Sequence, residues 1–204
     1  MIALIDYGAG NVRSVHKALE TIGAAVERVE TPTPLEAADK IVLPGVGAFG
    51  DCIDSLRAMG LVAPIHRAVE DGVPFLGICV GMQVLFEEGE EMGLHKGLGL
   101  LPGRVVRFPD SIVDQGRKIP HTGWNQIEET QETELLVGIP DGAWAYFNHA
   151  YYCRPIPEHT IARTQYGIAF ASAVRREDVY GIQFHPEKSQ VVGLKILQNF
   201  VEGV

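Results

Sequence analysis

Hydrophobic residues in the first ninety positions fall into short runs separated by longer segments of mixed polarity. The short, mainly apolar runs are typical of strands buried on both faces of a sheet, and they lie at residues 2–5, 25–29, 41–43 and 73–76. Between them, apolar residues recur at helical spacing over 12–22 and over 50–71, with a break near Gly60. This alternation predicts a parallel sheet with right-handed crossovers and helices on both faces.

After Gly89 the pattern changes. Glycines and Pro102 mark loops, and short β-prone runs follow one another without helices between them, at residues 104–108, 144–147, 161–163, 168–170 and 179–184. Runs this close predict antiparallel strands added to the sheet. Ser189 then fits the cap of a final amphipathic helix. The expected fold is therefore α/β, with a mixed sheet whose N-terminal part is parallel.

Composition fits one domain over residues 1–204, because 46% of the 204 residues are hydrophobic. The net charge of −9 and the scattered basic residues argue against a nucleic acid or a membrane surface as partner. The three cysteines, at positions 52, 79 and 153, are odd in number and show no paired spacing, which argues against a disulfide framework and favours a reducing compartment. The start lacks a basic leader, and no apolar run approaches the ~18 residues of a membrane span. We expect a cytoplasmic protein.

Residues 77–83, with the sequence GICVGMQ, place a cysteine where the fourth predicted strand turns into a helix. Gly77 and Gly81 flank Cys79 and let strand and helix approach closely, as in a nucleophile elbow. The helix N-terminus would favour the reactive thiolate. A free cysteine is also often a small buried hydrophobic residue. On this stretch alone the two interpretations are equally supported.

A catalytic cysteine needs a base and a group that orients the base, usually far away in sequence. His185 directly follows the predicted strand 179–184, at a strand end where α/β proteins form sites. Pro186 stiffens the turn, and Glu187 can face the same side as His185. We therefore predict the triad Cys79, His185 and Glu187. A zinc deaminase would need a Pro-Cys-x-x-Cys motif downstream, and an α/β-hydrolase would place its acid before the histidine, so both are disfavoured.

Two glycine-containing turns follow predicted strands, at residues 8–11 and 44–47. In the first, Asn11 fits a helix N-cap, and a dinucleotide-binding fingerprint fails because Arg13 stands where its third glycine belongs. The second, with the sequence PGVG, presents backbone N–H groups where α/β proteins bind ligands, or is an ordinary strand-to-helix turn.

Taken together, these motifs resemble the class I (triad) glutamine amidotransferases. The elbow and residues 181–189 carry the resemblance, and the segments 6–11, 44–50, 123–125 and 146–149 narrow it to glutaminase subunits of imidazole glycerol phosphate synthases. It covers essentially the whole chain and implies a three-layer, flavodoxin-like fold without cofactor or metal. Asn148 and Thr122 depart from the family pattern, which more often has an apolar residue and a methionine there.

The resemblance implies that the triad hydrolyses glutamine to glutamate and ammonia through a cysteine thioester. It places the oxyanion donors at Val80 and in the turn formed by Gly45, Val46 and Gly47. It assigns the amino-acid end of glutamine to Gln83 and Glu91, although Glu91 also fits a solvated acidic face. Glycines flank Val46, so we further hypothesise that its peptide rotates at little cost and keeps an isolated subunit nearly silent.

The resemblance also implies a heterodimer with a (β/α)8-barrel cyclase subunit that consumes the ammonia. Asn11, Trp124 and Lys188 match family positions at or near that interface, although Trp124 also fits core packing and Lys188 an exposed lysine. Two alternatives stay open. One is a glutaminase of the pyridoxal phosphate synthase type, and the other is a non-catalytic flavodoxin-like redox sensor in which Glu187 would have no role.

Overall fold

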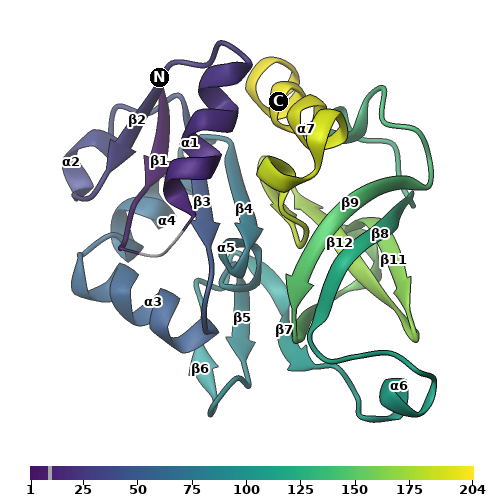
Figure 1. Ribbon diagram of the computed structural model, residues 1–204. Coiled ribbons are helices and arrows are strands. Elements are labelled where there is room, and N and C mark those ends of the chain that lie inside the picture. Colours follow the sequence, from purple (N-terminus) through teal and green to yellow (C-terminus); the bar gives the residue numbers. More distant parts are fainter. Residues whose placement is uncertain (9–10) are drawn as a thin grey trace.

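The computed structural model describes residues 1–8 and 11–204 (Figure 1). Positions 9 and 10 of the first predicted glycine turn lie outside the described residues. The first part of the chain alternates strands and helices as predicted, with β1 (Ile2–Ile5), α1 (Val12–Thr21), β2 (Val26–Val29), α2 (Pro32–Leu35), β3 (Lys40–Gly45), α3 (Phe49–Ala58), α4 (Val62–Glu70) and β4 (Phe75–Cys79). The predicted helix over 50–71 is broken near Gly60 into α3 and α4, as expected.

The main sheet has the strand order β2-β1-β3-β4-β13-β12-β11-β8-β9. Its later strands are β8 (His121–Glu129), β9 (Ala143–His149), β11 (Thr160–Tyr166), β12 (Ile168–Arg176) and β13 (Val179–Ile182). β13 pairs parallel with β4 and antiparallel with β12, so the sheet changes direction at this strand. The prediction of a parallel N-terminal part with antiparallel additions is confirmed.

A second sheet of four strands, in the order β10-β7-β5-β6, was not predicted. The run 104–108 was expected in the main sheet, but most of it belongs to β7 of this second sheet because it pairs with β5 and β10. It contains β5 (Phe86–Gly89), β6 (His95–Lys96), β7 (Leu101–Arg107) and β10 (Tyr151–Pro155). The helix expected after the elbow is only the single turn α5 (Val80–Gln83), because the next apolar residues enter β5. A short apolar run is compatible with a buried strand as well as with a helix. Residues 86–89 form a strand because they pair with β7.

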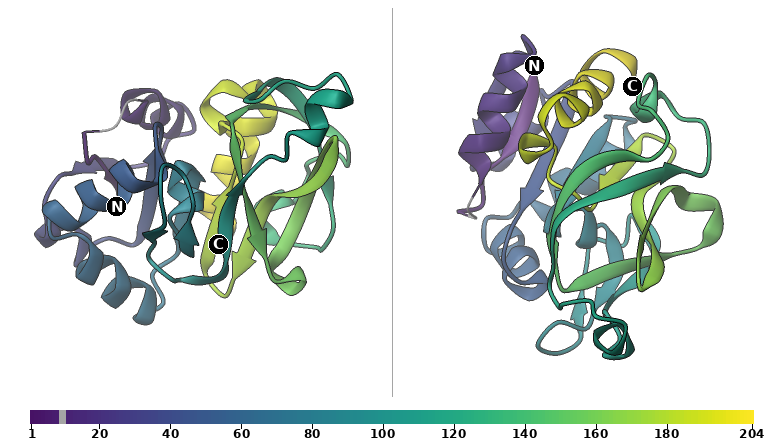
Figure 2. Two further views of the ribbon diagram at one scale, coloured as in Figure 1. Left: turned by 90° about the horizontal axis from the view of Figure 1, so that it is seen from below. Right: turned by 45° about the vertical axis from the view of Figure 1, so that its right-hand side comes forward.

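Helices cover both faces of the parallel part and give the three predicted layers. Figure 2, seen from below, shows α1 and α7 (Gln190–Gly203) on one side and α3 and α4 on the other. The remaining short helical segments are α6 (Ser111–Asp114), η1 (Glu134–Leu136), η2 (Pro157–His159) and η3 (Pro186–Lys188). The carboxyl ends of β3, β4 and β13 therefore meet at one edge, where α/β sheets place their sites.

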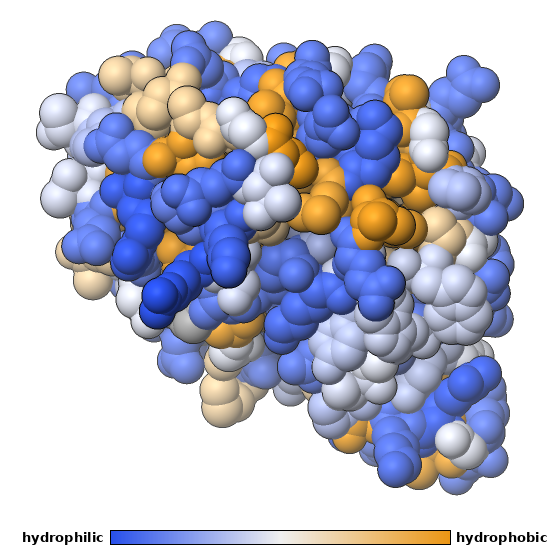
Figure 3. Space-filling model, turned by 45° about the horizontal axis from the view of Figure 1, so that its top comes forward, coloured by the Kyte–Doolittle hydropathy of each residue, from blue (hydrophilic) through white to orange (hydrophobic). Residues whose placement is uncertain are grey.

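Central strands are buried along their whole length: every residue of β1, β4 and β13 is buried. On the face shown in Figure 3, hydrophobic residues appear as patches interrupted by hydrophilic ones. Within residues 1–8 and 11–204, no helix has both the length and the apolar character that a membrane crossing requires.

Candidate active site

Cys79 ends β4 at a strained corner. Its φ of 57° and ψ of −112° are unusual for a residue with a side chain, and such strain is typical of functional sites. The corner is possible because Gly81 packs on β3 so closely that a Cβ there would lie 1.9 Å from the Leu43 carbonyl oxygen. The elbow is thus confirmed, but α5 aligns only one turn of peptide dipoles behind the sulfur. Most of the electrostatic support of a thiolate must come from elsewhere.

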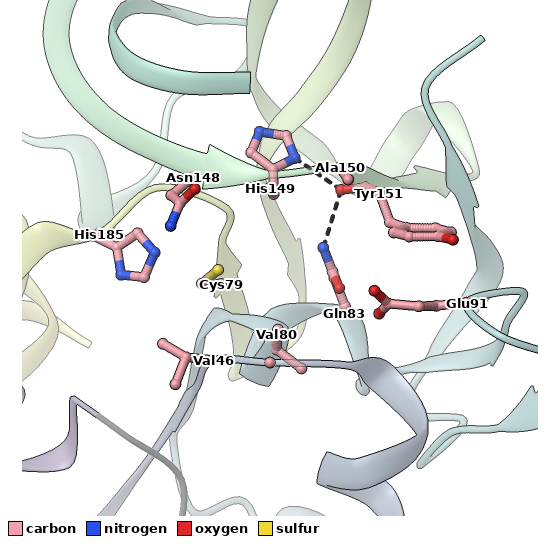
Figure 4. Close-up of a pocket in the computed structure, with 11 residues that line it drawn as sticks. Val46, Cys79, Val80, Gln83, Glu91, Asn148, His149, Ala150, Tyr151 and His185 are labelled. Atoms are coloured by element: carbon pink, nitrogen blue, oxygen red, sulfur yellow. Dashed lines mark hydrogen bonds between the residues drawn. The ribbon is translucent and has the colours of Figure 1, made fainter. Parts of the chain in front are cut away.

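His185 provides that support. Its Nδ1 lies 2.9 Å from Glu187 Oε1, and both side chains are buried. Burial lowers the pKa of His185, but hydrogen bonds and charge interactions with Cys79 and Glu187 outweigh it and raise the pKa to about 10. In Figure 4 the His185 ring and the Cys79 sulfur lie at the same end of the pocket. The structure therefore brings the three predicted triad residues together and favours an imidazolium beside the sulfur.

Asn11 reaches the triad from α1. It stands at the N-cap position, but its φ is 77° and its side chain makes no capping bond, so the predicted capping role is wrong. Its amide instead donates a hydrogen bond to Glu187 Oε1, the oxygen that also contacts His185. Two donors therefore converge on one carboxylate oxygen, which fixes the orientation of Glu187.

The other two cysteines have a different environment. Burial raises the pKa of Cys52 to about 12, and it raises the pKa of Cys153 well above its usual value. Both therefore stay as neutral thiols at physiological pH.

A pocket of about 80 Å³ opens beside the Cys79 sulfur, and it is lined by Val46, Gly47, Cys79, Val80, Gln83, Glu91, Asn148, His149, Ala150, Tyr151 and His185. Figure 4 shows Val46 and Val80 on one side of it and His149 and Ala150 on the other. Three of the predicted oxyanion residues thus lie in the lining. Gly45 lies behind it at the end of β3, where a Cβ would be 2.5 Å from the Gly81 nitrogen.

Gln83 and Glu91 lie at the end of the pocket away from His185 (Figure 4). Gln83 Nε2 donates to the Tyr151 carbonyl at 3.0 Å and to Gln183 Oε1 at 3.1 Å. Glu91 Oε2 accepts the Phe49 backbone N–H at 2.8 Å. Glu91 is therefore part of the pocket and not of a solvated acidic face.

Sequence reasoning gave no role to five residues of this site. Four follow one another at the corner between β9 and β10, and the fifth precedes Phe184 and His185: Asn148, His149, Ala150, Tyr151 and Gln183. The signal for Gln183 was a polar residue in an otherwise apolar strand. The two departures from the family pattern form a pair, because Thr122 Oγ1 donates to Asn148 Oδ1 at 3.0 Å across β8 and β9.

An aromatic row links the surface to the triad. The Trp124 side chain is 44% exposed, and its ring centroid lies 6.1 Å from that of Tyr146. Tyr146 in turn lies 6.4 Å from the His185 ring, and the Lys188 amine stands over its face at 5.5 Å. Core packing, the alternative for Trp124, does not describe this half-exposed side chain.

The glutamine amidotransferase class-I family model matches residues 3–204. A chain from Syntrophotalea carbinolica, named imidazole glycerol phosphate synthase subunit HisH, is 52% identical over 203 residues and covers 98% of both chains. A HisH subunit from Desulfitobacterium hafniense is 53% identical over 201 residues, covering 98% of this chain and 93% of its own. One from Archaeoglobus fulgidus is 48% identical over 201 residues, with 98% of each chain covered.

Solved structures share the fold at lower sequence identity. A glutamine amidotransferase crystal structure superposes with a TM-score of 0.76 at 21% identity, over 99% of this chain and 98% of that chain. The PurLQS structure from Thermotoga maritima superposes with a TM-score of 0.76 at 21% identity, covering 98% of this chain and 96% of that chain. These likenesses support the predicted three-layer architecture.

Proposed function

The chain belongs to the class I glutamine amidotransferases, and we propose that Cys79, His185 and Glu187 are the residues with which it hydrolyses glutamine as the glutaminase subunit of an imidazole glycerol phosphate synthase. In this role it supplies ammonia for a step of histidine biosynthesis. The observation that supports the residue assignment best is the His185–Glu187 contact of 2.9 Å beside the strained Cys79.

His185 takes the thiol proton, and the Cys79 sulfur attacks the side-chain amide carbon of glutamine to form a tetrahedral intermediate. His185 then returns the proton to the departing nitrogen, so that the C–N bond breaks and ammonia leaves a γ-glutamyl thioester. Water, deprotonated by the same imidazole, cleaves the thioester and regenerates the thiol with release of glutamate. Glu187 holds the imidazole by its Nδ1–H and stabilises the imidazolium in both halves.

The tetrahedral oxyanion needs donors, and the Val80 backbone N–H at the elbow supplies the first. The Gly45-Val46-Gly47 turn is the source of the second. Gly47 has a φ of 94°, so this turn uses backbone freedom that only glycine has without strain. Rotation of the Val46 peptide would exchange a carbonyl for an N–H at the oxyanion, which is the control step that we hypothesise.

The substrate's amino group is placed at Glu91 and Gln83. Both protons of the Gln83 amide nitrogen are used, toward Tyr151 and Gln183, so its remaining polar atom is the acceptor Oε1. An acceptor and a carboxylate side by side suit an ammonium group and not a carboxylate. This arrangement orients glutamine with its side-chain amide toward Cys79.

The ammonia passes to a (β/α)8-barrel cyclase subunit in a cytoplasmic heterodimer. Supporting this assignment, Trp124, Tyr146 and Lys188 form the row that leads from the surface to the triad, and Asn11 contacts the triad from the same end of the sheet. Direct transfer matters because free ammonia near neutral pH is mostly ammonium, which is not a nucleophile.

Glutamate release by the purified chain, alone and with a barrel cyclase and its ligand, tests this function. We expect little release from the subunit alone, a large increase in the complex, and none with Cys79→Ala. Equal rates with and without the cyclase would contradict the control step. Absence of release from every parent preparation would instead favour the redox sensor.

A further inference from the structure

A series of hydrogen bonds leads from Asn125 on β8 to the pocket, and its central His121–His149 contact is buried. Asn125 Nδ2 donates to the Gln165 carbonyl at 3.1 Å and contacts His121 Nε2 at 3.2 Å. His121 Nδ1 lies 3.2 Å from His149 Nε2, and His149 Nδ1 lies 2.8 Å from the Tyr151 carbonyl. None of the roles given above to the triad, the oxyanion turn or the partner surface uses these two histidines.

The carbonyls of Gln165 and Tyr151, at the two ends of this hydrogen-bond series, fix the proton positions along it. A carbonyl can only accept, so His149 Nδ1 and Asn125 Nδ2 must both carry the hydrogens that face Tyr151 and Gln165. If both imidazoles are neutral, His149 Nε2 accepts from His121 Nδ1–H, and His121 Nε2 accepts from Asn125. Every group is then satisfied by a single pattern in which both histidines carry the Nδ1–H tautomer.

Aromatic rings pack around the two imidazoles. His121 stacks on Tyr166 and Phe147, with centroid distances of 3.9 and 4.8 Å. His149 lies 5.1 Å from the Phe170 ring, and both histidines are buried. The hydrogen bond between His121 and His149 is buried, so its loss would leave a polar nitrogen unsatisfied at a cost in stability.

The Tyr151 carbonyl, where this series of hydrogen bonds ends, also accepts from a second donor, Gln83 Nε2, at 3.0 Å. Because this oxygen can only accept, it dictates that the Gln83 amide turns its nitrogen toward β10 and its oxygen toward Glu91, as Figure 4 shows. Gln183, oriented by the same amide, then points its Nε2 at the Cys79 sulfur, 3.8 Å away. One carbonyl therefore sets the orientation of the group that faces the substrate's amino group.

We propose that His149, held by His121 and Asn125, is a positioning residue for glutamine binding: it fixes the Tyr151 carbonyl and thereby the acceptor face of Gln83. The inference rests on the proposed glutaminase function for its kinetic consequence. The hydrogen-bond pattern itself does not depend on that function.

Asparagine and glutamine at position 149 form a matched pair of substitutions. The amide nitrogen of His149→Asn replaces Nδ1–H and keeps the donor to Tyr151, whereas that of His149→Gln replaces the distal nitrogen and does not. In the complex with the cyclase, we expect His149→Gln to raise the KM for glutamine about tenfold with kcat changed less than threefold. His149→Asn should restore KM to within about threefold of the parent.

A second measurement is independent of activity. Nitrogen chemical shifts of histidine-labelled protein should show His121 and His149 as neutral Nδ1–H tautomers from pH 8 to pH 5. An Nε2–H tautomer or a titration of His149 in this range would overturn the proposal. So would equal KM values for the two variants in an active, folded complex. An inactive parent complex with the expected tautomers would contradict the proposed function and leave the positioning pattern standing.

Discussion

Replacing Glu187 with glutamine tests how much of the chemistry depends on one buried carboxylate. The side chain is fully buried, and its Oε1 accepts from His185 and from Asn11. Among the described residues, Oε2 has no hydrogen-bond partner. Glutamine keeps the size and removes the charge, so the substitution changes electrostatics and tautomer with little change in packing.

The expected loss of kcat follows from the pKa of His185 and from its hydrogen bond to Glu187. Its pKa is about 10 instead of 6.5, so its partners outweigh burial by about 5 kcal/mol. Cys79 and Glu187 are the two partners, and the loss of one hydrogen bond to a charged group costs about 2 kcal/mol, or roughly 30-fold in rate. If the new amide turns its nitrogen toward Nδ1, the imidazole is held in the wrong tautomer, which costs up to ~10⁴-fold in related triads. We therefore expect kcat to fall by between 30-fold and 10⁴-fold.

Glutamate release by the cyclase complex at saturating glutamine measures this loss, with Glu202→Gln as a control for the same change of charge on the exposed face of α7. The KM should change little because Glu187 does not line the pocket. A loss of kcat below about threefold would refute the assignment of Glu187 as the orienting acid. So would an equal loss in the control variant.

Three further predictions concern other parts of the chain. Gly81→Ala should lower the free energy of unfolding by at least about 3 kcal/mol, because its Cβ would lie 1.9 Å from a main-chain oxygen of β3. Chemical denaturation measures this loss, and a value under about 1 kcal/mol would contradict the close packing of the elbow. Burial lowers the pKa of His121 to about 4 and of His149 to about 3, so the unfolded state binds more protons below pH 6.5. The free energy of unfolding should thus fall by about 2 kcal/mol per pH unit as the pH is lowered from 6.5 to 4.5. A variant that combines His121→Asn with His149→Asn should lose most of this pH dependence. Trp124→Ala should weaken cyclase binding about tenfold or more in a titration, whereas Val113→Ala, which removes an exposed side chain of α6, should not.

Local patterns predicted the nucleophile and its partners well. The glycines on either side of Cys79 are a local signal for the elbow. The two-residue spacing of His185 and Glu187 was also a useful signal, but the expected extended segment was wrong: residues 186–188 form the turn η3, and the Glu187 carboxylate contacts the imidazole from that turn. The apolar runs of the parallel strands were equally clear, since burial on both faces leaves no polar positions to confuse the pattern.

The sequence could not predict the rest of the pocket, because strand register determines it. β8 has the sequence HTGWNQIEE, with few apolar residues, and only its pairing with β9 sets His121 opposite His149. Likewise, β10 supplies the Tyr151 carbonyl from the second sheet, which no periodicity indicated. Such contacts depend on which distant segments meet and not on the residues within one segment.

β13 is the last strand to be synthesised and lies at the middle of the main sheet, between β4 and β12. Until residues 179–182 have left the ribosome, the strand that joins β4 to β12 is missing. Every residue of β4 is buried in the finished sheet. The halves must therefore join in a late, long-range step of folding. His185 comes after this strand in the sequence, so an incomplete chain that already carries Cys79 lacks this histidine. The active site is thus completed only when this late strand is in place.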